Sequence, residues 1–281
     1  MKIRIKHRAT KTILTAAAVS LMITTFGLTK HSYAANKDNV NLSYAVYVGS
    51  TKMFKIAYSL ELNPTSYKAV MHLKPKGLAK FFANISMVMQ ATGVLNKAQI
   101  LPVYFSNYQK KKRRKRTAEV NWNGKVQPTT KRTWKIGTAK SNSLNKSVKA
   151  SIPDPLSAFL RLGITSAEKP CIGTQRIYDG STVYDLSFKM LQQTQLTGQS
   201  SSSYKGPAYK CQIKHTPVAG FSKKRLAKAL AKPAVFNVWF APITSKVAGK
   251  TILVPVAATG TVKGRSFSAY TRRSLYNGKP M

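Results

Sequence analysis

The sequence predicts a mainly β protein: a strongly curved antiparallel sheet or an incomplete, half-open β-barrel with two or three short helices. The first observation is the alternation of apolar and polar residues in many short segments, as in Leu42–Val48. The second is the turn signals between these segments, such as Asn63-Pro64 and Asp179-Gly180. The third is that few segments show helical spacing. This combination is typical of antiparallel architectures that curl or close.

The N-terminus has the three parts of an export signal. Positive charges between Lys2 and Lys11 precede an uncharged apolar stretch at 13–28, and Ser32-Tyr33-Ala34 supplies small residues for cleavage. The alternative is a retained membrane anchor, which fits less well because the stretch spans about 16 residues and a membrane helix needs about 20. We therefore expect a signal peptide at 1–34 and a single periplasmic, β-rich domain at 35–281.

The first half of that domain is expected to consist mostly of strands. Alternation and turn residues predict them at 42–48, 53–62, 66–73, 103–108 and 118–122. The segment 78–94 is ambiguous, because its first residues have helical spacing and its later ones suit a strand. Residues 124–150 contain few large apolar groups, and we expect a long loop or a pair of weak strands there.

The second half begins with a short helix and then returns to strands. Pro153-Asp154-Pro155 opens the expected helix at 156–162, and Gly163 is expected to end it, since Pro favours helix starts and Gly favours helix ends. Asp154 is expected to cap this helix or to lie in its first turn. A second helix is expected at 223–232. Strands are predicted at 175–178, 182–190, 209–214, 235–240, 251–257 and 265–271.

Charge is the most unusual property of the chain. It has 47 Lys and Arg against 7 Asp and Glu, a net charge of +40. Such a surplus favours a polyanionic partner. The longest basic run lies between two predicted strands, at the tip or flank of a hairpin, and is the candidate polyanion site: Lys110, Lys111, Lys112, Arg113, Arg114, Lys115 and Arg116.

Three other interpretations of the basic run remain open. A run of like charges is often a solvated loop. Lysines also protect edge strands from pairing with other chains. Aromatic residues near the run would suit stacking on single-stranded nucleic acid, although strand aromatics more often fill a core.

The two cysteines agree with export. Cys171 and Cys211 do not resemble a zinc site, which needs four ligands with close pairs. In an oxidising compartment they suggest one disulfide, and the alternative is two buried free thiols.

The order of several short segments resembles an exported bacterial family known as domain of unknown function 3108. The matching segments are 43–49, 101–104, 154–160, 177–180, 184–186, 206–211, 217–221, 238–240 and 254–256, with Cys171 between the third and fourth. The resemblance implies a β-rich periplasmic protein without an assigned activity, in which Cys171 and Cys211 pair. The basic run departs from the usual pattern of the family.

No arrangement of residues in the sequence predicts catalysis. The domain contains two histidines, His72 and His215, and the acids Asp154, Asp179 and Asp185 all suit structural roles. Nucleophile, metal-protease and phosphate-loop motifs are absent. We therefore expect a non-enzymatic protein without metal or cofactor.

Two functions of different classes follow from these observations. The first is a cell-envelope protein that binds or carries a lipid-like or other anionic component on a curved sheet with a basic rim. Its partner would be lipid head groups, lipopolysaccharide or a wall polymer. The second is an envelope docking protein without a ligand. Nucleic-acid binding is a third, weaker alternative. A continuous apolar cavity would favour the first function, and a filled interior would favour the second.

Overall fold

Strands account for most of the chain, as the alternating pattern predicts. The computed structural model describes residues 37–77, 79–82, 85–96, 99–124, 126–165, 169–262 and 264–281. The expected signal peptide at 1–34 lies outside these residues. Residues 35–281 form one compact unit. Among the described helices, none has both the length and the apolar character needed to cross a bilayer.

The strands of the described chain form one 14-stranded sheet. In chain order they are β1 (Asp38–Val48), β2 (Thr51–Asn63), β3 (Ser66–Pro75), β4 (Ile85–Asn96), β5 (Gln99–Lys111), β6 (Arg114–Asn121), β7 (Thr129–Arg132), β8 (Ile172–Tyr178), β9 (Val183–Leu196), β10 (Gly206–Ala219), β11 (Ala234–Ser245), β12 (Lys250–Val262), β13 (Arg265–Tyr276) and β14 (Lys279–Pro280). The helices are α1 (Ala79–Phe82), α2 (Thr138–Ser147), α3 (Pro155–Thr165) and α4 (Lys223–Ala231).

The sheet order is β7-β6-β5-β4-β3-β2-β1-β13-β12-β11-β10-β9-β8, and β14 pairs with β13. All pairings are antiparallel, and β1 joins the two halves by pairing with β13. The sheet therefore ends in β7 and β8 and does not close into a barrel. Three of the described helices have nine or more residues, and α1 is a single turn. The predicted fold class, a strongly curved antiparallel sheet, is confirmed.

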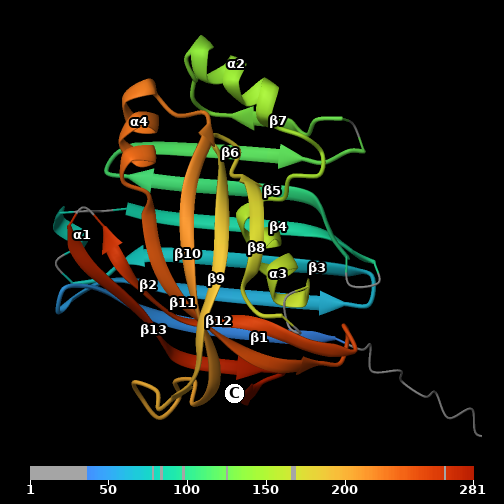
Figure 1. Cartoon of the computed structure of the whole chain (residues 1–281), viewed down its shortest axis with the longest axis vertical. Coiled ribbons are helices and arrows are strands. Elements are labelled where there is room, and N and C mark those ends of the chain that lie inside the picture. Colours follow the sequence, from blue (N-terminus) through green and yellow to red (C-terminus); the bar gives the residue numbers. More distant parts are fainter. Residues whose placement is uncertain are drawn as a thin grey trace, which may run out of the picture. The chain divides into compact units, whose positions relative to one another are not determined.

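The two halves of the sheet fold over each other around helix α3. Figure 1 shows β8, β9 and β10 crossing in front of β2–β6, with α3 between these layers. Helix α3 contacts β3, β4 and β5 on one side and β8 and β12 on the other. The largest core cluster contains residues from both halves and from α3, including Val40, Phe105, Leu156, Tyr178 and Ile252. The concave face of the sheet is therefore the interior of the protein.

The two edges of the sheet meet at one corner through side chains. The Tyr178 hydroxyl at the end of β8 lies 3.0 Å from Thr130 Oγ1 of β7, and it accepts a hydrogen bond of 2.5 Å from Arg132 Nη2. Arg132 Nε also donates to the carbonyl oxygen of Gly180. These side-chain contacts join β7 and β8, the two edge strands of the sheet, which do not pair through backbone hydrogen bonds.

Two local predictions were wrong. Residues 124–150 form one strand, β7, and a helix, α2, which the polar composition concealed because α2 buries Leu144 alone among its residues. Gly163 does not end the first predicted helix, since α3 continues to Thr165. A Cβ at Gly163 would lie 2.5 Å from the carbonyl oxygen of Leu253 in β12, so this glycine permits close packing of the helix on the sheet.

Candidate functional site

Helix α3 is held at its N-terminus by a buried carboxylate. Asp154 Oδ1 accepts hydrogen bonds from the backbone amides of Leu156 at 2.9 Å and Ser157 at 3.0 Å, as expected for a helix cap. The Ser157 hydroxyl also contacts Asp154 and lies 2.6 Å from the Tyr67 hydroxyl of β3. Burial raises the pKa of Asp154 to about 6, although the hydrogen bonds from Ser157 and Leu156 favour the charged form.

Further contacts fix α3 between the two layers. Arg161 Nη2 donates a 2.8 Å hydrogen bond to the carbonyl oxygen of Ile100 in β5. On the opposite side, Gly163 lies against the backbone of Leu253 in β12. The helix therefore occupies a defined position inside the curved sheet, and its side chains form one wall of the space beneath it.

A pocket of about 240 Å³ lies between α3 and the concave face of the sheet. Its walls are almost entirely apolar, and they come from α3, from β1–β3 and from β11–β13: Tyr44, Ile56, Tyr58, Met71, Leu156, Phe159, Phe236, Val238, Pro255, Ala257, Ala258 and Ala269. Leu156 and Phe159 lie three residues apart and therefore share a face of α3. Ala258 is paired with Ala269 on the neighbouring strand. The pocket exists because these alanines leave space opposite the larger side chains.

Two tyrosines supply the polar groups of this pocket. The Tyr44 hydroxyl donates to the carbonyl oxygen of Pro255 at 2.5 Å. The Tyr58 hydroxyl has no hydrogen-bond partner among the described residues. Burial, and secondarily the nearby Asp154, raises the pKa of Tyr58, so its phenol stays protonated and retains a free donor. A ligand with one polar oxygen next to an apolar chain would satisfy this donor.

The basic run forms the tip of the β5–β6 hairpin, in agreement with its expected position. Lys112 has a positive φ of 53° in the turn, and all seven side chains of Lys110–Arg116 are exposed. The ion pairs found in the described chain, Lys37–Glu61 and Arg176–Asp185, do not involve them. Arg116 lies 5.5 Å from the centre of the Trp134 ring. These charges are therefore exposed and form no ion pair with the acids of the described chain.

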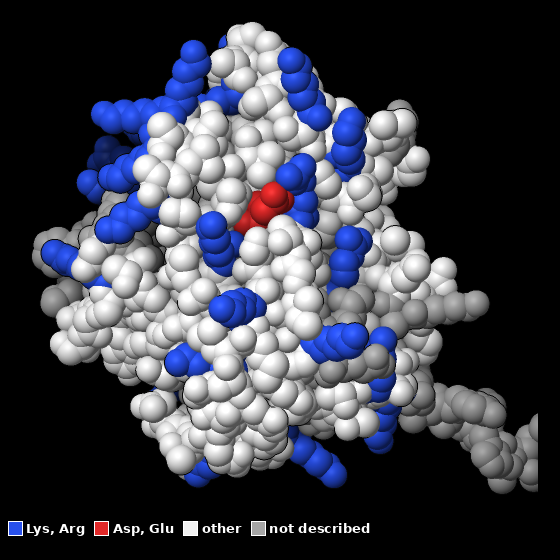
Figure 2. Space-filling model, viewed as in Figure 1, with Lys and Arg blue, Asp and Glu red and all other residues white. Residues whose placement is uncertain are grey.

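The structure extends this run into a longer cationic rim. In an antiparallel sheet alternate connections lie at the same edge, so the β1–β2, β3–β4 and β5–β6 connections lie together. We define the cationic rim as Lys110–Arg116 together with exposed lysines in or next to the other two connections: Lys52, Lys74, Lys76 and Lys80. Figure 2 shows basic side chains gathered on the side where Figure 1 places α1, α4 and the start of β6. Because whole strands separate these lysines in the chain, only the consecutive run Lys110–Arg116 is visible in the sequence.

The aromatic residues near the run are divided between the core and the surface. Phe105 and Trp122 are buried, and the Trp122 indole donates a 3.1 Å hydrogen bond to the carbonyl oxygen of Ile152. Tyr104 and Tyr108 are half-buried on the strand before the run. Phe105 and Trp122 therefore belong to the core, whereas the half-buried Trp134 contacts Arg116.

The candidate acid–base residues belong to several elements, and Asp185 on β9 lies next to His215 on β10, because Asp185 pairs with Thr216. Asp179 lies in the β8–β9 turn and accepts hydrogen bonds from the amides of Ser181 and Thr182, and Asp185 pairs with Arg176 at 2.8 Å on the outer face. His215 is half-buried, with the centre of its ring 4.7 Å from that of the Tyr184 ring. Its pKa is lowered by burial. His72 lies on β3. Within the described chain, no three metal-ligating side chains gather at one place.

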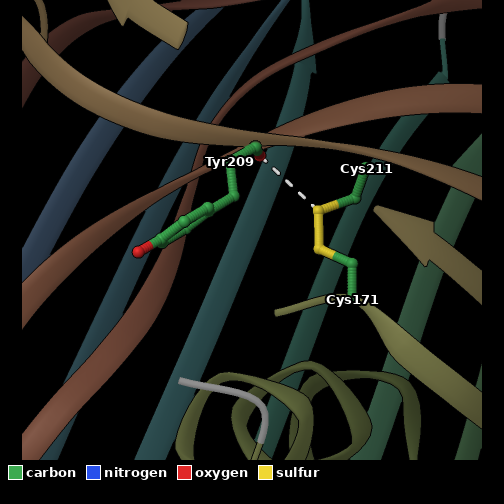
Figure 3. Close-up of a disulfide and its surroundings, with 3 residues drawn as sticks. All are labelled: Cys171, Tyr209 and Cys211. Carbon is green, nitrogen blue, oxygen red and sulfur yellow. Dashed lines mark hydrogen bonds between the residues drawn. A yellow bond between two sulfur atoms is a disulfide. The ribbon is translucent and has the colours of Figure 1, made fainter. Parts of the chain in front are cut away.

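The two cysteines form a disulfide, with Cα atoms 5.8 Å apart (Figure 3). Cys171 precedes the edge strand β8, and Cys211 lies in β10, on the far side of β9. A positive φ of 61° turns the chain at Cys171. Both side chains are fully buried, and Cys211 Sγ lies 3.5 Å from the carbonyl oxygen of Tyr209. The bond therefore fixes the free edge of the sheet next to α3.

Comparison with solved structures supports this architecture. The crystal structure of a beta-barrel-like protein of the domain of unknown function DUF1849 from Brucella abortus is similar, with a TM-score of 0.50 over 85% of this chain and 97% of that chain. At 8% sequence identity, this likeness shows the fold alone. No curated protein matches the sequence. The model of a protein family of unknown function, DUF3108, matches residues 43–262, and the chain therefore belongs to the DUF3108 family.

Proposed function

We propose that this protein is a non-catalytic periplasmic protein that binds or carries a lipid-like component of the cell envelope. An apolar chain would lie in the pocket beneath α3, and the cationic rim would meet anionic head groups or another anionic envelope polymer. The observation that carries the proposal is the apolar pocket inside a sheet whose edge carries a row of unpaired cations. The buried disulfide is compatible with the export that the N-terminal sequence predicts.

The energetics of the pocket favour an apolar occupant. Each methylene group moved from water into such a site contributes roughly 0.8 kcal/mol. The volume of about 240 Å³ lies just below the usual size of ligand pockets, so it suits part of one chain better than a whole lipid. The free Tyr58 hydroxyl would bind a carbonyl or ester oxygen at the end of that chain.

The proposal is tested by native mass spectrometry of the protein gently purified from its own periplasm. We expect an additional mass that organic solvent releases. The pocket-filling substitution Ala258→Leu should abolish it, whereas Leu101→Gln, at an exposed position on β5, should retain it. A parent protein without additional mass, which also takes up no acyl chain when titrated, would favour the alternative of a docking protein without a ligand.

A further inference from the structure

Helix α4 is an exposed cationic helix on the side of the molecule where the rim lies. It spans Lys223–Ala231, contacts β10 and buries none of its residues. The Ser222 hydroxyl caps it by accepting a hydrogen bond from the amide of Arg225. The helix contains basic residues and no acid. Its stability therefore depends little on a buried face, and most of its surface is available to a partner.

The two kinds of residue on α4 are separated around the helix. Leu226 and Leu230 are four residues apart and share a face, and Lys224 and Lys228 share another. The Leu230 side chain is 53% exposed, and Val235, at the start of the next strand, is 42% exposed. A helix with leucine on one face and lysines on another is typical of helices that lie in the plane of a lipid–water interface.

The start of α4 is connected to the basic hairpin through a short series of contacts. Gly220, just before α4, lies against the β8–β9 turn, where a Cβ would be 2.3 Å from the carbonyl oxygen of Ser181. Gly180 in that turn lies against Ala118 and Val120 of β6. Figure 1 places α4 above the start of β6, and Figure 2 shows several basic side chains there as well as others across the face, with the visible acidic side chains near its middle.

We propose that α4 docks the protein onto an anionic lipid bilayer, with its lysines on the lipid phosphates and Leu230 in the interface. A nucleic acid would use the same cations but would have no use for exposed aliphatic side chains, and α4 carries no aromatic residue to stack on bases. Phe236, in the wall of the apolar pocket, follows the end of α4 by five residues. Docking through α4 would therefore bring the pocket close to a membrane, but it does not require the pocket to hold cargo.

The test is a vesicle-binding assay with the protein beginning at residue 35. This form is suitable because every described core residue lies within it, and because the apolar segment 13–28 would bind lipid by itself. Phosphatidylcholine vesicles with and without about one-third phosphatidylglycerol are compared at about 0.1 M salt. We expect binding only to the anionic vesicles.

Matched charge variants locate the docking surface. The double variant Lys224→Gln, Lys228→Gln should weaken vesicle binding about 30-fold, because each cation at a membrane surface contributes a factor of roughly five to the affinity. The control is Lys205→Gln with Lys279→Gln, which removes the same charge. Lys205 precedes β10 whereas α4 follows it, so the strand separates them by roughly 45 Å. The control should lose less than about threefold.

A second pair of variants tests the apolar contact. Leu230→Gln should weaken binding about fivefold, whereas Leu101→Gln, with a similarly exposed leucine on β5, should not. Equal losses in the α4 and control variants, or equal binding to neutral vesicles, would overturn the proposal. Binding to duplex DNA but not to vesicles would overturn it in favour of nucleic acid. Ala258→Leu should bind vesicles as the parent does, which separates docking from cargo binding.

Discussion

Filling the apolar pocket should stabilise the protein and prevent it from binding an acyl chain. Ala258→Leu adds three carbon atoms at a position whose neighbours include Ala269, directly opposite on β13, and Phe159 of α3. Burying three such groups contributes at most roughly 2.4 kcal/mol. Some of this is lost to adjustment of the surrounding side chains, so we expect a gain of about 1–2 kcal/mol in the free energy of unfolding.

Urea denaturation measures this gain, and each kcal/mol should also raise Tm by about 2–4 °C. The same substitution should weaken binding of a fluorescent fatty-acid analogue at least about tenfold. The new side chain would exclude at least two methylene groups of the ligand from the pocket, at a cost of roughly 1.6 kcal/mol in binding free energy. The control is Ala241→Leu on β11. Ala241 is completely buried in a separate cluster with Tyr204 and Val256 and does not line the pocket beneath α3, so Ala241→Leu should lose about 1–3 kcal/mol through overpacking.

Two results would refute this reasoning. If Ala258→Leu destabilises the protein by more than about 1 kcal/mol, the space beneath α3 is filled in solution and no pocket exists. If the substitution stabilises the protein but leaves the affinity for the probe unchanged, the pocket is a packing defect and any acyl chain binds elsewhere.

Three further predictions concern the supports of α3 and of the sheet edge. Cys211→Ser, or reduction, should lower the free energy of unfolding by about 4 kcal/mol, since the disulfide closes a loop with a sequence separation of 40; an unchanged urea midpoint would contradict this. Asp154 holds its proton to about pH 6 in the folded protein but only to about pH 4 when unfolded, so its contribution to stability falls by roughly 3 kcal/mol as the pH rises between these values. The free energy of unfolding is measured against pH for the parent and for Asp154→Asn, and the difference between the two curves should fall between about pH 4 and pH 6. A difference that does not change with pH would contradict the prediction. Gly163→Ala should lower the free energy of unfolding by about 1–3 kcal/mol, because the added Cβ would meet the carbonyl oxygen of Leu253. If the variant has the same Tm as the parent, α3 is not packed so closely against β12.

Local features of the sequence predicted the strands, the β8–β9 turn and the Asp154 cap, because each depends on residues close together in the chain. Asp179 and Gly180 illustrate this: the carboxylate binds the amides of its own turn, and Gly180 adopts a φ of 87°. Gly163 shows where such reasoning fails. A glycine near the end of a helical pattern can either end the helix or let another part of the chain pack closely against it. Only the approach of Leu253 from a distant strand shows that the second explanation holds here.

The basic run was visible in the sequence because seven cations are consecutive, but the other lysines of the rim are separated by whole strands. Lys52 and Lys76 are brought to the same edge by antiparallel pairing, and the amide of Lys76 donates to the carbonyl oxygen of Met53 beside it. The pocket was not visible at all. It depends on Ala258 and Ala269 facing an α3 side chain across the interior, which requires the register of two strands and the position of the helix.

The sequence by itself determined that this is a strand-rich, strongly cationic chain with an export-like beginning and two cysteines, since composition and short-range periodicity are properties of the chain. The tertiary structure decided how the sheet folds over α3, which side chains leave a cavity there, and which lysines share an edge. These properties come from contacts between residues that are far apart in the chain, and the packing of a curved sheet is set by all of its strands together.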